Sequence, residues 1–240
     1  MRSCKLWLVF SSALAIASQC FSGNALAVVN VDRTRIIFSA NQTSQTLNVK
    51  NGPENPTVVQ IWSDEGDLMQ SPDLSKTPVF AMPPMMRLSP DEQRSIRLVL
   101  TTRQSLPEDR ESLYWLNIYQ IPALTQQTGS AERKIVLPLR IRLKVFVRPA
   151  TLNAPKPDDA QKLRFVVKGN QLRVENPTRW FMSLRLQIAN KIQVNDVMVA
   201  PLTTQSITLS QPAQPNEKVS YEVFDDNGNP VSYISTTRSS

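Results

Sequence analysis

The longest alternation of apolar and polar residues in the chain lies at positions 133–148, RKIVLPLRIRLKVFVR. From position 139 onward the odd positions carry aliphatic side chains, and positions 140, 142 and 144 carry cations. A period of two places these two sets on opposite faces of an extended strand. At roughly 3.3 Å per residue the segment would span on the order of 50 Å, well beyond the usual strand of about five or six residues. The pattern predicts one long strand.

Pro138 interrupts the even row of this strand. Proline has no N–H to donate to a ladder, so it is tolerated mainly on a sheet edge. We therefore expect the segment to lie partly on an edge, with a row of aliphatic side chains that begins with Ile135, Leu137 and Leu139. Such edges recruit other chains unless they are covered. Two interpretations remain open: a core strand covered by its own chain, or an edge offered to a partner.

The other apolar segments are short and separated by turn signals. They lie at residues 28–38, 46–49, 58–62, 94–100 and 113–121, and then at 163–167, 171–175, 181–188, 206–209, 219–224 and 231–236. A linker-like stretch at 153–159 falls between the two sets. Short strands at regular spacing are typical of β-sandwiches. We expect an all-β protein with a first domain at residues 28–149 and a smaller one at 150–240.

Residues 1–27 have the composition of a secretory signal. Arg2 and Lys5 form a charged start, residues 6–17 form a short apolar core, and small residues precede the expected cleavage after Ala27. The apolar core is too short to span a bilayer stably, and no later segment is long and apolar enough for a membrane helix. We expect an exported mature chain that does not insert into the membrane.

Both cysteines, Cys4 and Cys20, fall inside this signal. The mature chain would then have no cysteine, so an oxidising compartment adds no disulfide. Lipidation at Cys20 is disfavoured because Gln19 is larger than the small residue that normally precedes a lipidated cysteine.

The formal net charge of +7 includes the two cations of the signal, which leaves +5 for the mature chain. A basic chain invites comparison with nucleic-acid binders. The cations here are spread through strand-like alternation, without a clustered basic helix or base-stacking aromatics. An exported chain also has little access to nucleic acid, so we expect no nucleic-acid partner.

The chain lacks residues that several kinds of catalytic and metal site require. The chain has no histidine, which removes histidine-dependent nucleophile arrangements and the usual general acid–base residue. Without histidine or mature cysteine the usual zinc ligands are missing as well, and no glycine-rich phosphate loop is present. Twenty acidic residues leave paired-carboxylate hydrolysis open, but no constellation points to it. We expect neither an enzyme nor a metal or cofactor site.

Short motifs follow one another along the mature chain. In order they are Asp32-Arg33-Thr34-Arg35, Pro83-Pro84, Arg87-Leu88-Ser89-Pro90, LPEDRES at 106–112, Asn117 with Ile121-Pro122, Arg142 and Lys144 before FVRPA at 146–150, VENPT at 174–178, and Asp225 with Gly228. Together they resemble the PapD-like family, the periplasmic chaperones of the chaperone–usher pilus pathway. Each motif alone is weak, whereas the ordered set is specific.

The resemblance implies two immunoglobulin-like domains arranged as an L or boomerang. It implies a periplasmic chaperone, without a cofactor, that binds pilus or fimbrial subunits and delivers them to an outer-membrane usher. The long strand would be lent to a subunit that lacks its own last strand, which is donor-strand complementation. By the family's pattern Ile135, Leu137 and Leu139 would fill the groove of the subunit.

The same resemblance implies roles for two groups of charged residues. Arg35 and Lys144 would hold the terminal carboxylate of the subunit. Glu111, Arg148 and Asp225 would hold the two domains at their angle.

The loop at residues 123–133 is of moderate length and has no flanking cysteines. In this it resembles the short-loop subclass of the family, whose clients build thick rod-like pili.

Two other classes of protein compete with this interpretation. A structural fimbrial component or adhesin would typically carry a disulfide, which the mature chain lacks. A carbohydrate-binding or glycosidase-like sandwich would need an exposed aromatic platform, and the aromatics here mostly occupy core-like strand positions. The aliphatic row of the long strand also leaves self-association of the free chain open.

Overall fold

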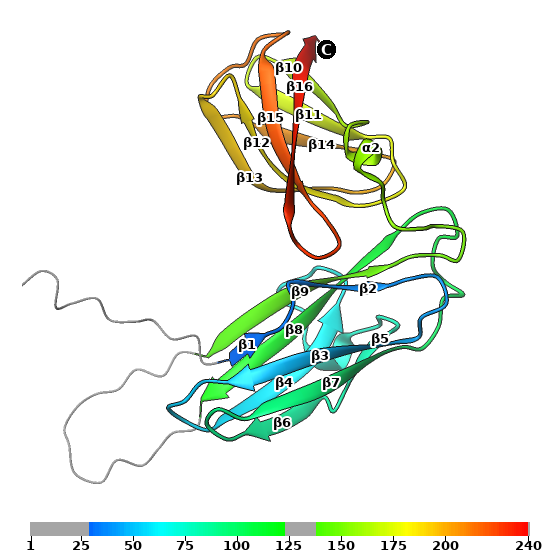
Figure 1. Ribbon diagram of the computed structural model, residues 1–240, viewed down its shortest axis with the longest axis vertical. Coiled ribbons are helices and arrows are strands. Elements are labelled where there is room, and N and C mark those ends of the chain that lie inside the picture. Colours follow the sequence, from blue (N-terminus) through cyan, green and yellow to red (C-terminus); the bar gives the residue numbers. More distant parts are fainter. Residues whose placement is uncertain (1–28, 123–137, 240) are drawn as a thin grey trace, which may run out of the picture.

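The protein is described by a computed structural model that covers residues 29–122 and 138–239. The expected signal at 1–27 and the loop at 123–133 lie outside the described residues, as do Ile135 and Leu137. The described residues form two β-rich domains set at an angle to each other, as the L-shaped arrangement implied by the resemblance requires (Figure 1).

The first domain is a sandwich of two sheets. One has the strand order β1-β3-β7-β5 and the other β2-β9-β8-β4-β6. The strands are β1 (Val29–Val31), β2 (Arg35–Phe38), β3 (Ser44–Asn51), β4 (Thr57–Asp64), β5 (Val79–Met82), β6 (Met85–Leu88), β7 (Gln93–Leu100), β8 (Ser112–Pro122) and β9 (Leu139–Val147), with a 3-10 turn, η2 (Pro72–Leu74), between β4 and β5.

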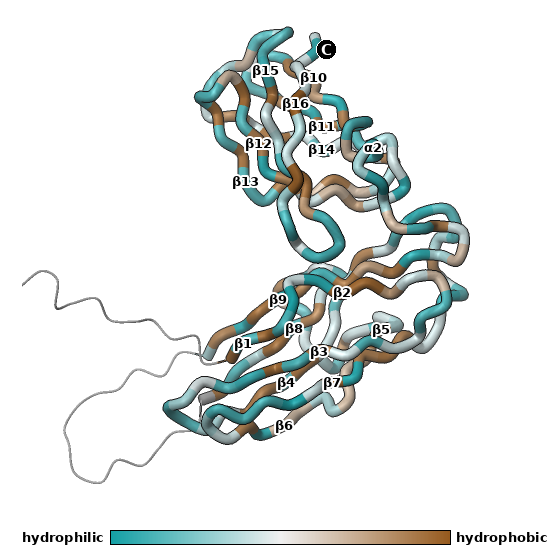
Figure 2. Tube along the Cα trace, viewed as in Figure 1, coloured by the Kyte–Doolittle hydropathy of each residue, from teal (hydrophilic) through white to brown (hydrophobic). Residues whose placement is uncertain are grey.

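Alternation along these strands builds the core of the first domain. Leu47, Ile96, Leu98, Leu116 and Ile118 come from both sheets and are fully buried. Each such side chain contributes about 1.5–3 kcal/mol when it leaves water. Apolar (brown) and polar (teal) positions alternate along the strands in Figure 2.

The second domain is one seven-stranded sheet folded into two layers, with the order β13-β12-β15-β16-β10-β11-β14. Its last strand first pairs antiparallel with β15 and then parallel with β10, which joins the two layers. The elements are a short helix α2 (Pro157–Ala160), β10 (Arg164–Lys168), β11 (Gln171–Asn176), β12 (Met182–Ile188), β13 (Ile192–Val199), β14 (Thr203–Thr208), β15 (Lys218–Phe224) and β16 (Pro230–Ser239). A separate core lies between the layers.

The described part of the alternating segment forms β9 over residues 139–147, and the pairing of this strand differs between its two halves. β8 pairs with β9 along residues 139–147, whereas β2 pairs only with residues 144–147. Among the described residues the half at 139–143 therefore has a neighbour on one side only, in agreement with the predicted partial edge. No helix in the described ranges is long and apolar enough to cross a membrane.

Three strands lie outside the predicted segments, and the segment predicted as one strand at 28–38 forms two, β1 and β2, in different sheets. β5 and β6 flank Pro83-Pro84, and each is the outermost strand of its sheet, where proline is tolerated. β13 lacks a clean alternation because its pairing with β12 shifts register between Leu184 and Leu186, and Asp196 has a φ of 54°. A bulge of this kind breaks the period of two.

Candidate functional site

Arg35 and Lys144 are brought together by the parallel ladder between β2 and β9, where they face each other in register. Their neighbours Ile36 and Val145 are fully buried in the core of the first domain. Because side chains alternate along a strand, the two cations point to the other side of the sheet. Both are half-buried, and both reach residues of the second domain.

In the second domain, strands β15 and β12 supply the contacts of the two cations. Arg35 Nη1 donates to the carbonyl oxygen of Phe224 at 3.1 Å, and the guanidinium lies 5.9 Å from the ring centroid of the same residue. Lys144 Nζ donates to Ser183 Oγ at 3.1 Å. The Nε atom of Arg35 is buried and has no hydrogen-bond partner among the described residues. The two cations therefore retain unused donor capacity.

No carboxylate in the described ranges forms an ion pair with Arg35 or Lys144. Burial lowers the pKa of Arg35, against the attraction of Asp226 and Asp225. Burial and the nearby charge of Arg35 also lower the pKa of Lys144. Two half-buried cations that repel each other favour an anion between them. The pair has the chemistry of a carboxylate-binding site.

A cavity of about 210 Å³ adjoins Arg35 at the junction of the two domains. Its walls include Phe146 of β9, Phe181 near β12, and Phe224 of β15. Phe146 and Phe181 pack with ring centroids 6.0 Å apart. The cavity therefore combines aromatic walls with charged side chains of both signs, since Glu111, Asp225 and Asp226 line it as well as Arg35 and Arg148.

Arg148 also lines this cavity and links the two domains through two carboxylates. Its Nε donates to Glu111 Oε1 at 2.8 Å, and its two Nη atoms donate to Asp226 at 2.7 and 2.6 Å. Glu111 Oε2 also accepts the backbone N–H of Phe181 at 2.9 Å. Although burial lowers it, the pKa of Arg148 is raised by the hydrogen bond with Asp226 and the charge of Glu111. The network therefore joins β9 to the β15–β16 turn.

The carboxylate that pairs with Arg148 is Asp226, whereas the prediction named Asp225. The side chain of Asp225 turns back into its own loop, where Oδ1 accepts the backbone N–H groups of Asn227 and Asn229 at 2.9 and 2.8 Å. Aspartate commonly caps a turn in this way. Because residues 225 and 226 are both aspartates, the prediction chose between them by their place in the motif alone.

Of the three residues expected to fill a partner's groove, only Leu139 is described. It lies at the start of β9 and is 45% exposed. Leu143, on the same face, is buried in the first domain's core, and Ile141 is partly buried against it. The aliphatic row therefore runs out of the core toward the surface as it approaches Leu139.

Two protein-family models match the chain, one over each domain. The pili and flagellar-assembly chaperone PapD N-terminal domain matches residues 28–153, and the pili assembly chaperone PapD C-terminal domain matches residues 158–235. The chain belongs to the PapD-like family of pilus-assembly chaperones.

Named members of the family resemble the chain over almost all of its length. The chaperone protein HifB of Haemophilus influenzae is 31% identical over 228 residues, which cover 93% of this chain and 93% of that protein. The chaperone protein LpfB of Salmonella typhimurium is 32% identical over 217 residues, covering 89% and 88%.

A solved structure of the SafA pilin of Salmonella enterica in complex with the SafB chaperone is also similar. Its matching chain has a TM-score of 0.75 and 28% identity, and the match covers 89% of this chain and 98% of that one. The crystal structure of the YadV chaperone matches with a TM-score of 0.72 and 28% identity, covering 88% and 100%. The fold of the PapD-like family thus extends over both domains.

The second domain supplies site residues that the sequence did not reveal. Ser183 and Phe224 lie on strands β12 and β15, which the apolar pattern did predict. Their role depends on how one domain docks against the other, and strand periodicity carries no information about that. The PapD-like motifs identified the two cations of the first domain, but not the residues of the second domain that contact them.

Replacing Arg35 by glutamine should raise the pKa of Lys144. The positive charge of Arg35 is one of the two causes that lower this pKa, and its removal makes the charged ammonium easier to form. A pH titration of ¹³C-methylated lysines, followed by NMR, measures the midpoint of Lys144. Arg33→Gln is a matched control, since exposed Arg33 pairs with Asp32 and should leave that midpoint unchanged. An equal midpoint in the wild type and in Arg35→Gln would contradict the expectation.

Proposed function

We propose that this protein is a periplasmic chaperone that captures pilus subunits and delivers them to an outer-membrane usher. The one-sided half of β9 would add to a subunit as its missing strand, in the manner of β-strand addition. Arg35 and Lys144 would bind the terminal carboxylate of that subunit. The expected signal at 1–27 supports export, and the relatives named above are chaperones.

The observation that carries this proposal is the position of the cation pair. Lys144 is the first residue of β9 after the one-sided half at 139–143, and it faces Arg35 across the ladder. A terminal carboxylate held there would place the preceding backbone of the subunit alongside residues 139–143. Since a register slip of one residue exchanges the faces of a strand, an anchor at this point would set which subunit pockets meet the aliphatic row.

Binding, rather than catalysis, is the activity that this geometry supports. The cation pair and the aromatic walls of the cavity provide recognition of an anionic chain end. Charge-assisted hydrogen bonds to a carboxylate contribute about 1.5–3 kcal/mol each, and buried aliphatic side chains add a similar amount each.

Co-purification from the periplasm with a pilin encoded beside this chain tests the proposal. We expect a one-to-one complex, measured by light scattering on a sizing column. A pilin that lacks its last residues should not be captured, because its new terminal carboxylate reaches the anchor only if the strand paired with residues 139–143 shifts out of register. A folded chaperone that captures none of the neighbouring pilins would refute the function.

A further inference from the structure

Among the described residues, the half of β9 at 139–143 has hydrogen-bonded support from β8 alone. Elements with few contacts open locally at low cost, and strand ends are the first to do so. A strand that is to receive a partner must nevertheless stay extended. Other contacts must therefore restrain these residues.

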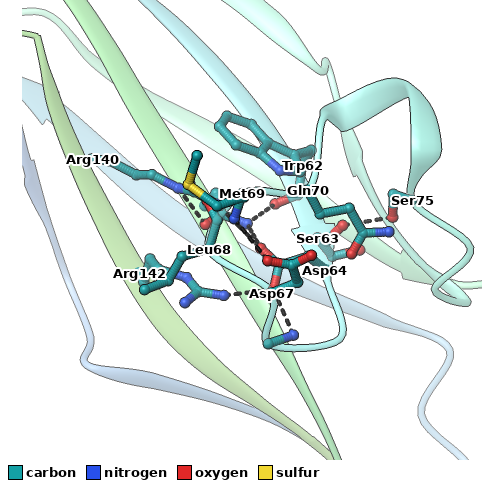
Figure 3. Close-up of polar contacts among 12 residues, drawn as sticks. Trp62, Ser63, Asp64, Asp67, Leu68, Met69, Gln70, Ser75, Arg140 and Arg142 are labelled. Carbon is teal, nitrogen blue, oxygen red and sulfur yellow. Dashed lines mark hydrogen bonds and ion pairs between the residues drawn. The ribbon is translucent and has the colours of Figure 1, made fainter.

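The even-numbered side chains of this half are tied across the sheet to Asp64, the last residue of β4. Arg142 Nη2 donates to Asp64 Oδ1 at 2.5 Å, and Arg140 Nη2 donates to Asp64 Oδ2 at 3.2 Å. β8 lies between β9 and β4, so each guanidinium reaches over one strand. Figure 3 shows both arginines converging on this carboxylate.

Asp64 is fully buried and accepts hydrogen bonds from four groups. Besides the two arginines, Asn117 Nδ2 donates to its Oδ2 at 2.6 Å and the Gly66 N–H donates to its Oδ1 at 2.7 Å. A carboxylate withdrawn from water is costly unless charged donors compensate for the lost hydration. The carboxylate and its arginines therefore depend on one another.

Aromatic rings and a second set of acceptors hold the arginine side chains in place. The guanidinium of Arg140 lies 4.9 Å from the ring centroid of Trp62, and that of Arg142 lies 4.8 Å from the ring centroid of Trp115. Arg140 also donates to the carbonyl oxygen of Leu68 at 2.7 Å. Stacking of this kind is a favourable cation–π contact, so two long side chains have defined positions along β9.

We propose that Asp64, acting through Arg140 and Arg142, positions the one-sided half of β9 for strand addition. This inference rests on the proposed function. The exposed side chain of Leu139 lies on the opposite face of the strand, so the network restrains the strand without covering the side chain that a subunit would bury. A strand that is already extended loses less conformational freedom on binding. Asp64 is thus a positioning residue.

The test compares Asp64→Asn with the wild type in two measurements on the mature chain. The first is amide hydrogen exchange of the free protein at residues 139–143. The second is the rate at which the chain captures a neighbouring pilin during refolding of that pilin from denaturant. We expect exchange to become faster and capture slower, each on the order of tenfold, which corresponds to the loss of one hydrogen bond to a charged group.

A series at Arg142 separates positioning from general stability. Arg142→Lys keeps a cation that can reach Asp64 and should retain wild-type exchange and capture, whereas Arg142→Gln should behave like Asp64→Asn. The matched control is Glu222→Gln, which removes another cross-strand pair of an arginine and a carboxylate, that of Arg185 with Glu222 in the second domain. It should change neither measurement.

The outcomes distinguish this inference from the proposed function. If Asp64→Asn does not fold, the Arg142 series decides the question. Unchanged exchange at 139–143, equal behaviour of Arg142→Lys and Arg142→Gln, or faster exchange throughout the first domain would each overturn the positioning role. A wild-type chain that captures no pilin refutes the proposed function, and the exchange data then still decide whether Asp64 restrains β9.

Discussion

Replacing Arg35 by alanine should weaken capture of a pilus subunit by at least about 100-fold and leave both domains folded. The guanidinium can offer a carboxylate two hydrogen bonds, each with a net contribution of about 1.5–3 kcal/mol, and about 1.4 kcal/mol corresponds to a factor of ten in affinity. Within the described protein, Arg35 is held by one hydrogen bond to Phe224 and by stacking, so its loss costs the fold little. Competition between the wild type and Arg35→Ala for a purified subunit gives the ratio of their affinities.

The controls for this prediction lie on the same stretch of chain. Arg33→Ala removes an exposed cation that pairs only locally with Asp32 and should leave capture unchanged, which excludes an effect of net charge. Lys144→Ala should resemble Arg35→Ala. The double variant should lose less than the sum of the two single losses, because both cations bind one carboxylate. Capture at the wild-type level by a folded Arg35→Ala chain would contradict the anchor.

Alternation was enough to predict β9, because a period of two is a local property of the sequence, and Pro138 indicated its edge. The same holds for the burial of Leu143 and Val145 in the core. The cation pair was different. Nothing in composition or spacing separates Arg35 and Lys144 from the other cations of the chain, and only the family's ordered motifs identified them.

The residues that the sequence did not reveal depend on contacts between distant segments. Asp64 ends an apolar strand and would ordinarily be expected at the surface, yet it is fully buried beneath two arginines from β9. The prediction named Asp225 in place of Asp226, because a motif identifies the turn but not which of its two aspartates pairs with Arg148. Side-chain direction in a turn is set by its hydrogen bonds, here those of Asn227 and Asn229 to Asp225.

Replacing Arg148 by methionine should lower the free energy of unfolding by about 3–5 kcal/mol, the usual effect of removing one partner from a buried ion pair. Methionine fills a similar volume but leaves Glu111 with its side chain 2% exposed and without a cation. Only the Phe181 N–H would still donate to that carboxylate among the described groups. Urea unfolding followed by tryptophan fluorescence measures the change as a shift of the midpoint at constant slope.

Variants of the two neighbouring aspartates show whether the interdomain contact is the one that matters. Asp226→Asn removes a carboxylate that is 35% exposed and should cost about 1 kcal/mol, since solvent screens a partly exposed pair. Asp225→Asn keeps an oxygen that can cap the turn and should cost less than about 0.5 kcal/mol. Glu222→Gln, which breaks an exposed pair within the second domain, should be similarly mild. A larger loss in Asp225→Asn than in Asp226→Asn would contradict this network. The expected order would show that the β15–β16 turn is held to β9 through Asp226, because only that side chain connects the turn to Arg148.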